Sequence, residues 1–377
     1  MKKSSWVDPS IYIRNLHVAE DVLQFPYTQE ILKQNLLPVT IVSKDSTPAA
    51  ISGNFPDNLK AGKQHLYLCS NKGDFFKPCP GTAEYQCCDY HVLSVGMNCP
   101  IDCVYCILQA YLDKPWITAF VNIDKLFSEL DSALQADRNK FFRIGTGEFT
   151  DSLAFERITG MSRKLVEFLA SYDNVLLELK TKSGYIDTLE KADHRGKTIL
   201  SWSLNSTEII TSHEIRSATL EERLDAARKG AEWGYGLGFH FDPIIEHPNW
   251  RKGYVETIDA LFATVPKESI AWISLGALRY LQPLKEIGTN RFPHSRIFFN
   301  EFILGLDGKA RYFRSQRQEM YTYIYNLLRE KISPDTCIYF CMESDEIWHD
   351  TMGFIPETQG GIPAMLDKAA RRAISKF

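Results

Sequence analysis

Cys99, Cys103 and Cys106 follow one another with gaps of three and two residues. This spacing lets a short loop turn three thiolates toward one small metal cluster. A cube of four iron atoms takes four ligands, and cysteine thiolates are the usual ones. Three local thiolates therefore leave one iron open for a non-protein ligand. A structural zinc site or three buried thiols is the alternative, but zinc sites usually pair their ligands to complete a set of four.

The triad is similar to the signature of the radical S-adenosylmethionine (SAM) enzymes, including the aromatic Tyr105 just before its last cysteine. The resemblance implies that Cys99, Cys103 and Cys106 hold a [4Fe-4S] cluster. It implies that the amino and carboxylate groups of SAM occupy the open iron. An electron from the reduced cluster would then split SAM into methionine and a 5′-deoxyadenosyl radical. Tyr105 would lie beside the adenine, at the reacting centre.

Beyond the triad, the chain resembles the spore photoproduct lyase family from about Tyr90 to Gly276, and more weakly after that. The matching runs are Cys106–Gln109, Lys114–Asn122, Glu178–Lys182, Ser203–Asn205, Gly234–Phe239, Asp242–Ile245 and Trp250–Tyr254. The resemblance implies a SAM-derived radical that splits a methylene-bridged thymine dimer back into two thymines. It also implies that Lys182 and Ser203 lie near the SAM carboxylate and ribose, with Asn205 two residues further along.

The chain departs from this family where hydrogen is returned to the product. The family has a cysteine after its second strand, whereas residues 142–152 of this chain contain none. Ile107 stands where the family has a tyrosine after the third cluster cysteine, so only Tyr105 of that pair is present. Two residues of the family's hydrogen-return relay are therefore missing from this chain.

Residues 145–148, which read Gly-Thr-Gly-Glu, occupy the region of the missing cysteine. They resemble the Gly-Gly-Glu segment that follows the second strand in many other radical SAM enzymes. There, carbonyl groups and the carboxylate accept hydrogen bonds from the SAM ammonium, and such charge-assisted bonds are strong. The resemblance implies that Gly145, Gly147 and Glu148 bind SAM. A glycine turn before a helix capped by Asp151 or Ser152 is the alternative.

Four further cysteines are candidates for the missing hydrogen donor. Cys79, Cys87 and Cys88 lie just before the first predicted barrel strand, and one of them could donate hydrogen or bind an auxiliary metal. Cys341 ends a predicted strand, 337–341, and could present a thiol at the barrel mouth. The alternative is that these side chains are buried as small hydrophobes, as free cysteine often is.

Short apolar runs alternate with amphipathic stretches from about residue 90, which is typical of βα units around a parallel sheet. Strands are predicted at Tyr90–Met97, Lys140–Gly145, Asn174–Lys180, Thr198–Leu204, Gly236–Asp242 and Ser269–Gly276. Helices are predicted at Asp124–Ala136, Phe155–Tyr172, Leu220–Trp233 and Gly253–Val265, with Thr219 and Glu222 forming a capping box before the third. Active sites of such barrels gather at the carboxyl ends of the strands, where the cysteine loop falls.

The predicted fold class is α/β, a partial (β/α)6 TIM-type barrel of the radical SAM type with extensions at both ends. Residues 1–89 would form an N-terminal lobe with extra cysteines, residues 90–280 the barrel, and residues 281–377 a C-terminal extension that completes the barrel mouth. The extension should contain a strand pair within Asn300–Tyr312, turning at Asp307-Gly308, and a helix at Gln316–Lys331.

Arg311, Tyr312 and Arg314 combine charge for phosphates with an aromatic stacking surface, so they are candidate nucleic-acid contacts. An amphipathic surface strand is the alternative. The net charge of −4 argues against an unselective polyanion binder. A start without the apolar stretch of a signal peptide, nine cysteines and no long apolar run favour a reducing cytoplasm, with no membrane partner.

Three hypotheses follow. The first is a spore photoproduct lyase-like enzyme that repairs a DNA lesion with electrons from a reductant such as flavodoxin or ferredoxin. The second is a radical SAM enzyme of the same fold acting on another base, a peptide or a small metabolite, which the Gly-x-Gly-Glu segment and the extra cysteines favour. The third is a nonenzymatic iron–sulfur or zinc protein that binds nucleic acid. The oligomeric state is left open.

Overall fold

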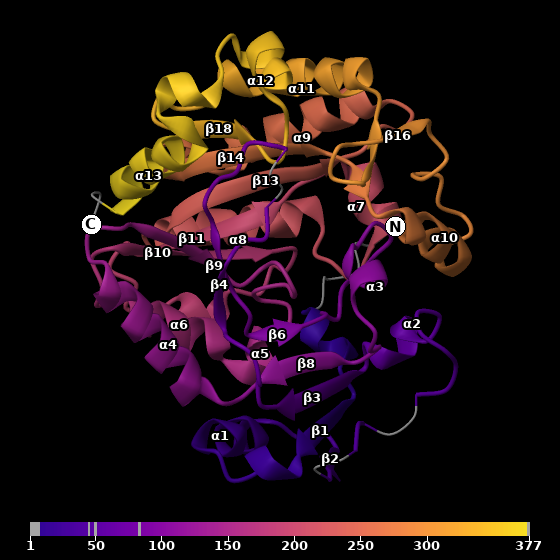
Figure 1. Ribbon diagram of the computed structural model, residues 1–377, viewed down its shortest axis with the longest axis vertical. Coiled ribbons are helices and arrows are strands. Elements are labelled where there is room, and N and C mark those ends of the chain that lie inside the picture. Colours follow the sequence, from indigo (N-terminus) through magenta and orange to yellow (C-terminus); the bar gives the residue numbers. More distant parts are fainter. Residues whose placement is uncertain (1–7, 44–45, 49–50, 82–83, 375–377) are drawn as a thin grey trace.

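A computed structural model describes residues 8–43, 46–48, 51–81 and 84–374. It is organised around two curved sheets, a larger one in the middle and an N-terminal one below it (Figure 1). The larger sheet contains β4 (Phe76–Pro78), β5 (His91–Leu93), β9 (Phe142–Gly145), β10 (Val175–Thr181), β11 (Thr198–Ser203), β13 (Gly236–Ile244), β14 (Ile270–Ala277) and β18 (Cys337–Phe340).

The larger sheet has the order β18-β14-β13-β11-β10-β9-β5-β4. The strands from β5 to β18 run parallel, and β4 lies antiparallel to β5. The edge strands β4 and β18 are not neighbours in this order, so the sheet is an open barrel. The predicted partial barrel is confirmed, and β18 adds a parallel strand to the predicted six.

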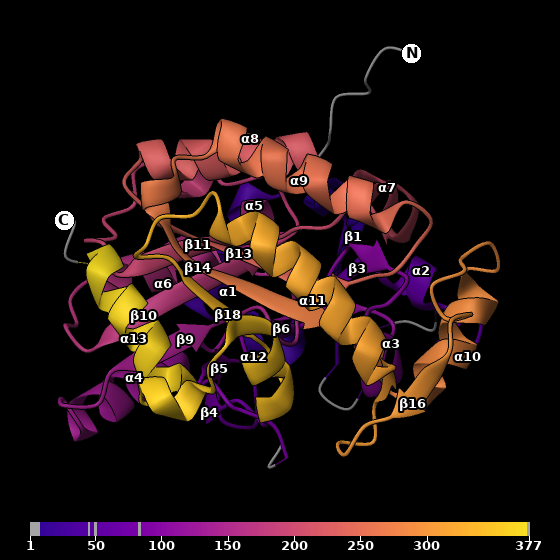
Figure 2. The same cartoon turned by 90° about the horizontal axis from the view of Figure 1, so that it is seen from above.

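Helices pack on the outer face of this sheet, where the strand residues are apolar (Figure 2). Those that contact its strands are α4 (Ile123–Ala136), α6 (Met161–Leu169), α8 (Leu220–Glu232), α11 (Arg314–Arg329) and α13 (Gly361–Ile374). α9 (Trp250–Thr264) and α12 (Asp345–Met352) pack against α11, whereas α5 (Glu156–Thr159) and α7 (Thr207–His213) pack mainly against other elements. The predicted capping box before α8 is confirmed, because Thr219 accepts from the Glu222 amide and the Glu222 carboxylate accepts from the Thr219 amide.

Two predicted elements are wrong in extent. The predicted strand Tyr90–Met97 is divided between β5 and β6 (Gly96–Met97), because the chain turns at Ser94 and the two halves enter different sheets. The predicted helix Phe155–Tyr172 is divided into α5 and α6 at Gly160, whose φ of +64° is left-handed and favours glycine. Both segments are apolar on several sides, so the pattern did not reveal the break.

The N-terminal sheet has the order β2-β1-β3-β8-β6. Its other strands are β1 (Asn15–Ala19), β2 (Val39–Val42), β3 (His65–Cys69) and β8 (Ile117–Phe120), accompanied by α1 (Pro26–Gln34) and α2 (Leu59–Gly62). Because β6 and β8 come from beyond residue 89, this sheet extends past the predicted boundary. The division at residues 89 and 280 stays a prediction, although β18 likewise extends the barrel sheet past residue 280.

The C-terminal part adds a small sheet beside the barrel mouth. It contains β15 (Arg279–Tyr280), β16 (Phe302–Leu304) and β17 (Ala310–Tyr312), and α10 (Gln282–Arg291) precedes β16. The predicted strand pair around Asp307-Gly308 is confirmed, since β16 and β17 pair antiparallel.

Smaller elements complete the fold. They are β7 (Asp102–Cys103), β12 (Glu214–Ile215), α3 (Leu108–Tyr111) and the 3-10 helices Pro9–Tyr12, Glu20–Val22, Asp187–Leu189, Lys267–Ser269 and Pro356–Gln359. None of the helices in the described ranges has the length and apolar character that crossing a bilayer requires.

Candidate active site

The loop that carries the three cysteines is held by backbone pairing to a distant part of the chain. In its middle, β7 pairs antiparallel with β12, so that Cys103 lies opposite Glu214. The Val104 amide donates to the His213 carbonyl at 2.9 Å. Before the first cysteine, Asn98 has a φ of +64°, a conformation that asparagine tolerates better than most residues. The loop therefore has a fixed shape.

Two buried cations also anchor this loop. Lys63, from the end of α2, places Nζ 2.5 Å from the Ile101 carbonyl and 3.1 Å from the Asp102 carboxylate. Arg291, from α10, approaches the same carboxylate at 2.9 Å. Arg291 also bonds to Gln109, whose amide donates to the Cys103 and Val104 carbonyls. Residues from the N-terminal and C-terminal parts thus meet at the loop that carries Cys99, Cys103 and Cys106, which we call the cluster loop or cysteine loop.

The cysteine thiols fit a cluster with three protein ligands. Cys99, Cys103 and Cys106 interact electrostatically with one another. All three also interact with the Lys63 ammonium and raise its pKa. Burial raises the pKa of Cys99 to about 12, and the Lys63 charge opposes that rise. In the described residues, no three His, Cys, Asp or Glu side chains converge on one ion. The three thiols are near enough to interact electrostatically, and cysteine thiolates are the ligands that iron–sulfur clusters use.

The segment after β9 lies directly against this loop. The Asn98 amide donates to the Phe149 carbonyl at 2.8 Å, and the Thr150 hydroxyl donates to the Asn98 carbonyl at 2.6 Å. The predicted SAM residue Glu148 lies next to these contacts and faces the barrel interior together with Gly147. A side chain at Gly147 would meet the Lys180 Cβ at 3.1 Å.

Gly145 is required by its neighbour Tyr90. A Cβ at position 145 would stand 1.5 Å from the Tyr90 hydroxyl, so only glycine fits beside this ring. The residue was predicted to contact SAM. Its contact with Tyr90 explains why position 145 is glycine, because the ring packs against the end of β9.

Asp151 fixes the predicted SAM residue Lys182 beside the same loop. Its carboxylate accepts from the Lys182 amide at 2.7 Å and from the Thr181 hydroxyl at 2.6 Å. It also accepts from the amides of Leu153 and Ala154, but α5 begins only at Glu156 with Phe155 as its N-cap residue, so Asp151 does not cap this helix. The Lys182 ammonium lies 5.8 Å from the centre of the Tyr105 ring. Lys182 and the cysteine loop therefore lie together, as predicted.

Tyr105 belongs to a buried network behind the cluster loop. Its hydroxyl donates to Glu214, which pairs with Arg223, and both charged side chains are at most 1% exposed. Burial and then the Glu214 charge raise the pKa of Tyr105 well above its ordinary value. Arg223 also donates to the Ser203 carbonyl at 2.8 Å. This network connects the predicted residues Tyr105 and Ser203.

Ser203 and Asn205 differ in what they offer to a ligand. Ser203 ends β11 and is buried. Asn205 follows it, but its side chain is committed to the protein: the oxygen accepts from Tyr254 at 2.7 Å, and the nitrogen donates to the Pro243 carbonyl at 2.7 Å. These bonds give Asn205 a structural role, and its contact with SAM stays a prediction.

A cavity of about 90 Å³ lies inside the barrel. Glu148, Lys180 and Asp242 line it, as do Glu178 and His240 further down the strands. Burial would lower the pKa of Lys180, but Asp242, Glu148 and Glu178 raise it, so its ammonium is charged. Arg279 and Lys180 hold the pKa of Asp242 below its ordinary value against the effect of burial.

Glu178 is the most heavily bonded carboxylate of this cavity. One of its oxygens accepts from Ser201 at 2.6 Å, from His240 at 2.8 Å and from Trp272 at 2.9 Å. Burial would raise the pKa of Glu178, but these donors, with His240 foremost, hold it below its ordinary value. His240 then accepts from Ser274 at 2.7 Å. Glu178, His240 and their partners thus form a hydrogen-bond network inside the barrel.

The sequence did not single out these cavity residues, although it held a signal for them. On β10, polar and apolar residues alternate, so that Glu178 and Lys180 face inward while Leu177 and Leu179 face the helices. The same alternation runs along β13 with His240 and Asp242. Polar residues at every second position of a strand with buried apolar neighbours indicate a polar barrel interior.

Three of the four additional cysteines converge on this cavity. Cys79, Cys88 and Cys341 line it, whereas Cys87 is exposed. Cys87 and Cys88 are hydrogen-bonded side by side, which lowers the pKa of Cys87 to about 6. The described residues offer these thiols no third ligand around a common ion, so an auxiliary metal gains no support from the geometry.

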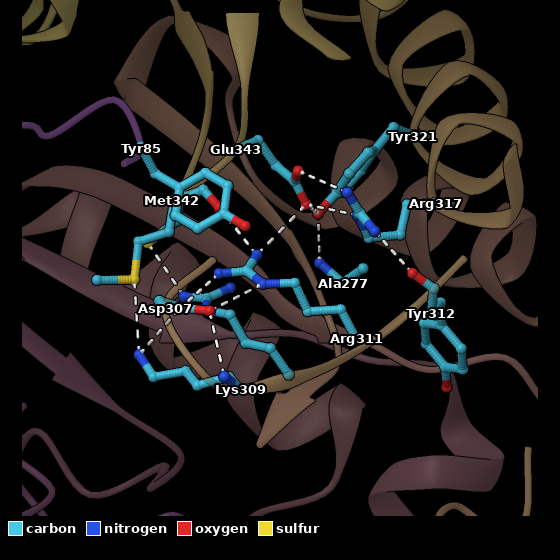
Figure 3. Close-up of polar contacts among 12 residues, drawn as sticks. Tyr85, Ala277, Asp307, Lys309, Arg311, Tyr312, Arg317, Tyr321, Met342 and Glu343 are labelled. Atoms are coloured by element: carbon cyan, nitrogen blue, oxygen red, sulfur yellow. Dashed lines mark hydrogen bonds and ion pairs between the residues drawn. The ribbon is translucent and has the colours of Figure 1, made fainter. Parts of the chain in front are cut away.

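The expected nucleic-acid surface is not formed by Arg311 and Tyr312. Arg311 is 2% exposed and pairs with Asp307 at 2.7 Å, and its guanidinium also contacts Glu343 (Figure 3). Tyr312 is buried, with its hydroxyl accepting from the Glu246 amide. Arg314 is half-exposed and pairs with Asp350. Arg311 and Tyr312 therefore hold the hairpin to the barrel, and this corrects the prediction.

Comparison with known proteins agrees with this geometry. The sequence model of the family described as spore photoproduct lyase matches residues 16–341. The chain belongs to the spore photoproduct lyase family. The spore photoproduct lyase of Geobacillus sp. (strain Y412MC61) is 29% identical over 257 residues, covering 67% of this chain and 71% of the relative. That of Bacillus subtilis (strain 168) is 26% identical over 326 residues, covering 82% and 89%.

Solved structures show the same fold. A spore photoproduct lyase double mutant with bound AdoMet and dinucleoside spore photoproduct has a TM-score of 0.79 at 24% identity, covering 90% of this chain and 100% of that one. A single mutant with dinucleoside spore photoproduct also has a TM-score of 0.79, at 23% identity, covering 87% and 99%. The resemblance stated from the sequence is confirmed for the family and for the fold.

Proposed function

We propose that this protein is a radical SAM lyase that repairs the methylene-bridged thymine dimer known as spore photoproduct. Membership of the family supports the reaction class. The observation that carries the assignment is the contact between the cysteine loop and the segment after β9, through Asn98, Phe149 and Thr150. This contact brings the cysteine loop against the segment that carries Glu148. Lys182 lies beside both, because Asp151 of the same segment accepts from its amide.

We assign the [4Fe-4S] cluster to Cys99, Cys103 and Cys106, and the SAM pocket to Glu148, Lys182 and Ser203. The bound cofactors supply the 5′-deoxyadenosyl radical. Glu148 would accept from the SAM ammonium, and Lys182 would pair with its carboxylate, both as charge-assisted bonds. Tyr105 would pack beside the adenine, held by its bond to Glu214.

The protein's own residues then have to admit the lesion and exclude water. The cavity lies at the centre of the barrel, so a lesion in DNA must leave the base stack to reach it. Lys180, whose charged ammonium lines the cavity, is suited to donate to a thymine carbonyl. A one-electron reductant such as flavodoxin or ferredoxin would reduce the cluster.

A different substrate for the same radical chemistry is the second candidate. Its support is the charged character of the cavity and the absence of a cysteine from residues 142–152.

The test is to give the anaerobically reconstituted, dithionite-reduced protein SAM and dinucleotide spore photoproduct, and to quantify 5′-deoxyadenosine and thymidylyl-thymidine by chromatography. The proposal expects both products. Deoxyadenosine without thymidylyl-thymidine would favour the second candidate.

A further inference from the structure

The open side of the barrel is bridged by the connection between β4 and β5, residues 79–90, of which 82–83 lie outside the described ranges. We call it the seam loop. In Figure 1 this violet segment runs from β4 up toward β14. Gln86 donates to Asp345, in the first turn of α12, at 2.8 Å. Tyr85 accepts from the Leu306 amide at 3.3 Å, and its ring lies 4.3 Å from the Arg311 guanidinium (Figure 3). The loop is thus fixed to the β18 side.

The seam loop and β18 bring three thiols to one cavity from opposite edges of the sheet. Cys79 and Cys88 come from the loop, and Cys341 directly follows β18. A negative charge on Cys341 would raise the pKa of both Cys79 and Cys88, which places the three sulfurs within electrostatic range of one another.

The backbone of Cys341 differs from that of the other two cysteines in its position along the barrel axis. Its amide donates to the Leu275 carbonyl at 3.1 Å, which continues the β18–β14 ladder at the carboxyl ends of the strands. Cys79 instead pairs through its amide with the Tyr90 carbonyl, just before β5, and the Cys88 carbonyl accepts from Arg143. The cluster loop and the segment after β9 also lie at the carboxyl end.

The neighbours of Cys341 fix its side chain and keep its proton in place. An Arg279 nitrogen lies 3.3 Å from its sulfur and 3.4 Å from the Asp242 carboxylate. Burial and the Asp242 charge raise the pKa of Cys341, although Arg279 and Lys180 oppose the rise. The side chain is therefore a thiol at neutral pH. A hydrogen-atom donor must be a thiol, because a thiolate has no S–H bond to give.

We propose that Cys341 returns the hydrogen atom to the substrate-derived carbon radical. This inference rests on the proposed function and supplies the donor that residues 142–152 lack. The S–H bond of Cys341 breaks homolytically, the C–H bond of the product forms, and the unpaired electron remains on sulfur. The reaction proceeds in this direction because an S–H bond is weaker than a C–H bond. A dithiol reductant then restores the S–H bond, and two turnovers oxidise one dithiol to its disulfide.

The test is repair of dinucleotide spore photoproduct in D₂O, with dithionite, SAM and dithiothreitol, followed by mass spectrometry of thymidylyl-thymidine isolated in H₂O. Thiol hydrogens exchange with solvent, so the wild-type product should carry one deuterium on carbon. Cys341→Ser keeps a polar contact for Arg279 but has an O–H bond too strong to donate. We expect it to form deoxyadenosine within about twofold of the wild-type rate while repair falls at least about tenfold.

The matched control is Cys337→Ser, on the same strand, which should retain repair and the deuterium. Cys79→Ser and Cys88→Ser probe the two other thiols of the cavity, and the product of each should still carry the deuterium. The inference is overturned if Cys341→Ser repairs the lesion normally, if wild-type product lacks deuterium, or if only Cys79→Ser or Cys88→Ser loses repair. Wild-type protein that repairs nothing refutes the proposed function itself, so the two failures are distinguishable.

Discussion

The strongest stability prediction concerns Lys63, which connects the N-terminal lobe to the cluster loop. Its side chain is 1% exposed and that of its partner Asp102 is 4% exposed. Replacing Lys63 with Met removes the bonds to Asp102 and to the Ile101 carbonyl while keeping most of the volume. A hydrogen bond to a charged group contributes about 1.5–3 kcal/mol, and breaking a buried ion pair costs about 3–5 kcal/mol. Because Arg291 still pairs with Asp102, we expect a loss of about 3 kcal/mol.

Urea unfolding of the iron-free protein, followed by tryptophan fluorescence, measures this loss. With a slope of about 3 kcal/mol per molar urea, the midpoint should fall by about 1 M. Iron bound per chain after reconstitution should also fall, because the loop loses an anchor and the thiolates lose a nearby positive charge. Lys60→Met is the matched control, since Lys60 is exposed on the same helix α2. Equal midpoints for the two variants would refute the reasoning.

Three further predictions concern the site. Glu148→Gln should weaken SAM binding by about 1–3 kcal/mol, measured anaerobically by calorimetry, and unchanged affinity would make Glu148 a turn residue. Cys87, whose pKa the Cys88 hydrogen bond lowers to about 6, should be alkylated by iodoacetamide with a rate that rises through pH 6 and levels off above pH 7. A midpoint near pH 9 would contradict this. Gly145→Ala should cost about 1–3 kcal/mol in urea unfolding, because its Cβ would strike the Tyr90 hydroxyl, and wild-type stability would argue against that packing.

The grouping of the three cluster cysteines could be predicted from local sequence alone. The spacing of Cys99, Cys103 and Cys106 is a property of one short loop, so no tertiary information was needed to group them. Lys182 was predicted from its match to the spore photoproduct lyase motif, and Glu148 from its resemblance to the Gly-Gly-Glu segment. Both residues follow neighbouring strands, β10 and β9. In a parallel sheet those places meet at one edge, and Asp151 indeed joins the two segments.

The errors came from contacts between segments far apart in the chain. Arg311 looks like a surface cation in the sequence, but Asp307 and Glu343 compensate its charge inside the protein. A buried charge of this kind depends on a partner whose position the sequence pattern does not give. The partners of Asn205, Tyr254 and Pro243, likewise come from segments that the sequence pattern does not bring together.

The convergence of three thiols on the cavity could be predicted only in part from the sequence. The sequence showed Cys79, Cys88 and Cys341 as unexplained, but their meeting depends on the seam loop and on β18 joining β14. A strand that pairs with a neighbour some sixty residues earlier in the chain leaves no local signature of that pairing. The sequence placed Cys341 at the end of a strand and so near the mouth, but only the fold shows that Cys79 and Cys88 share its cavity.

The central claim is that this chain repairs spore photoproduct with a SAM-derived radical. The most direct measurement is a time course of thymidylyl-thymidine and deoxyadenosine formed from dinucleotide spore photoproduct, comparing the reduced wild-type protein with Cys103→Ala. A dinucleotide carrying a cyclobutane thymine dimer serves as the substrate control. We predict repair of the spore photoproduct alone, and no repair or deoxyadenosine with Cys103→Ala. Deoxyadenosine formation by Cys103→Ala, or wild-type deoxyadenosine without any repaired dinucleotide, would contradict the account.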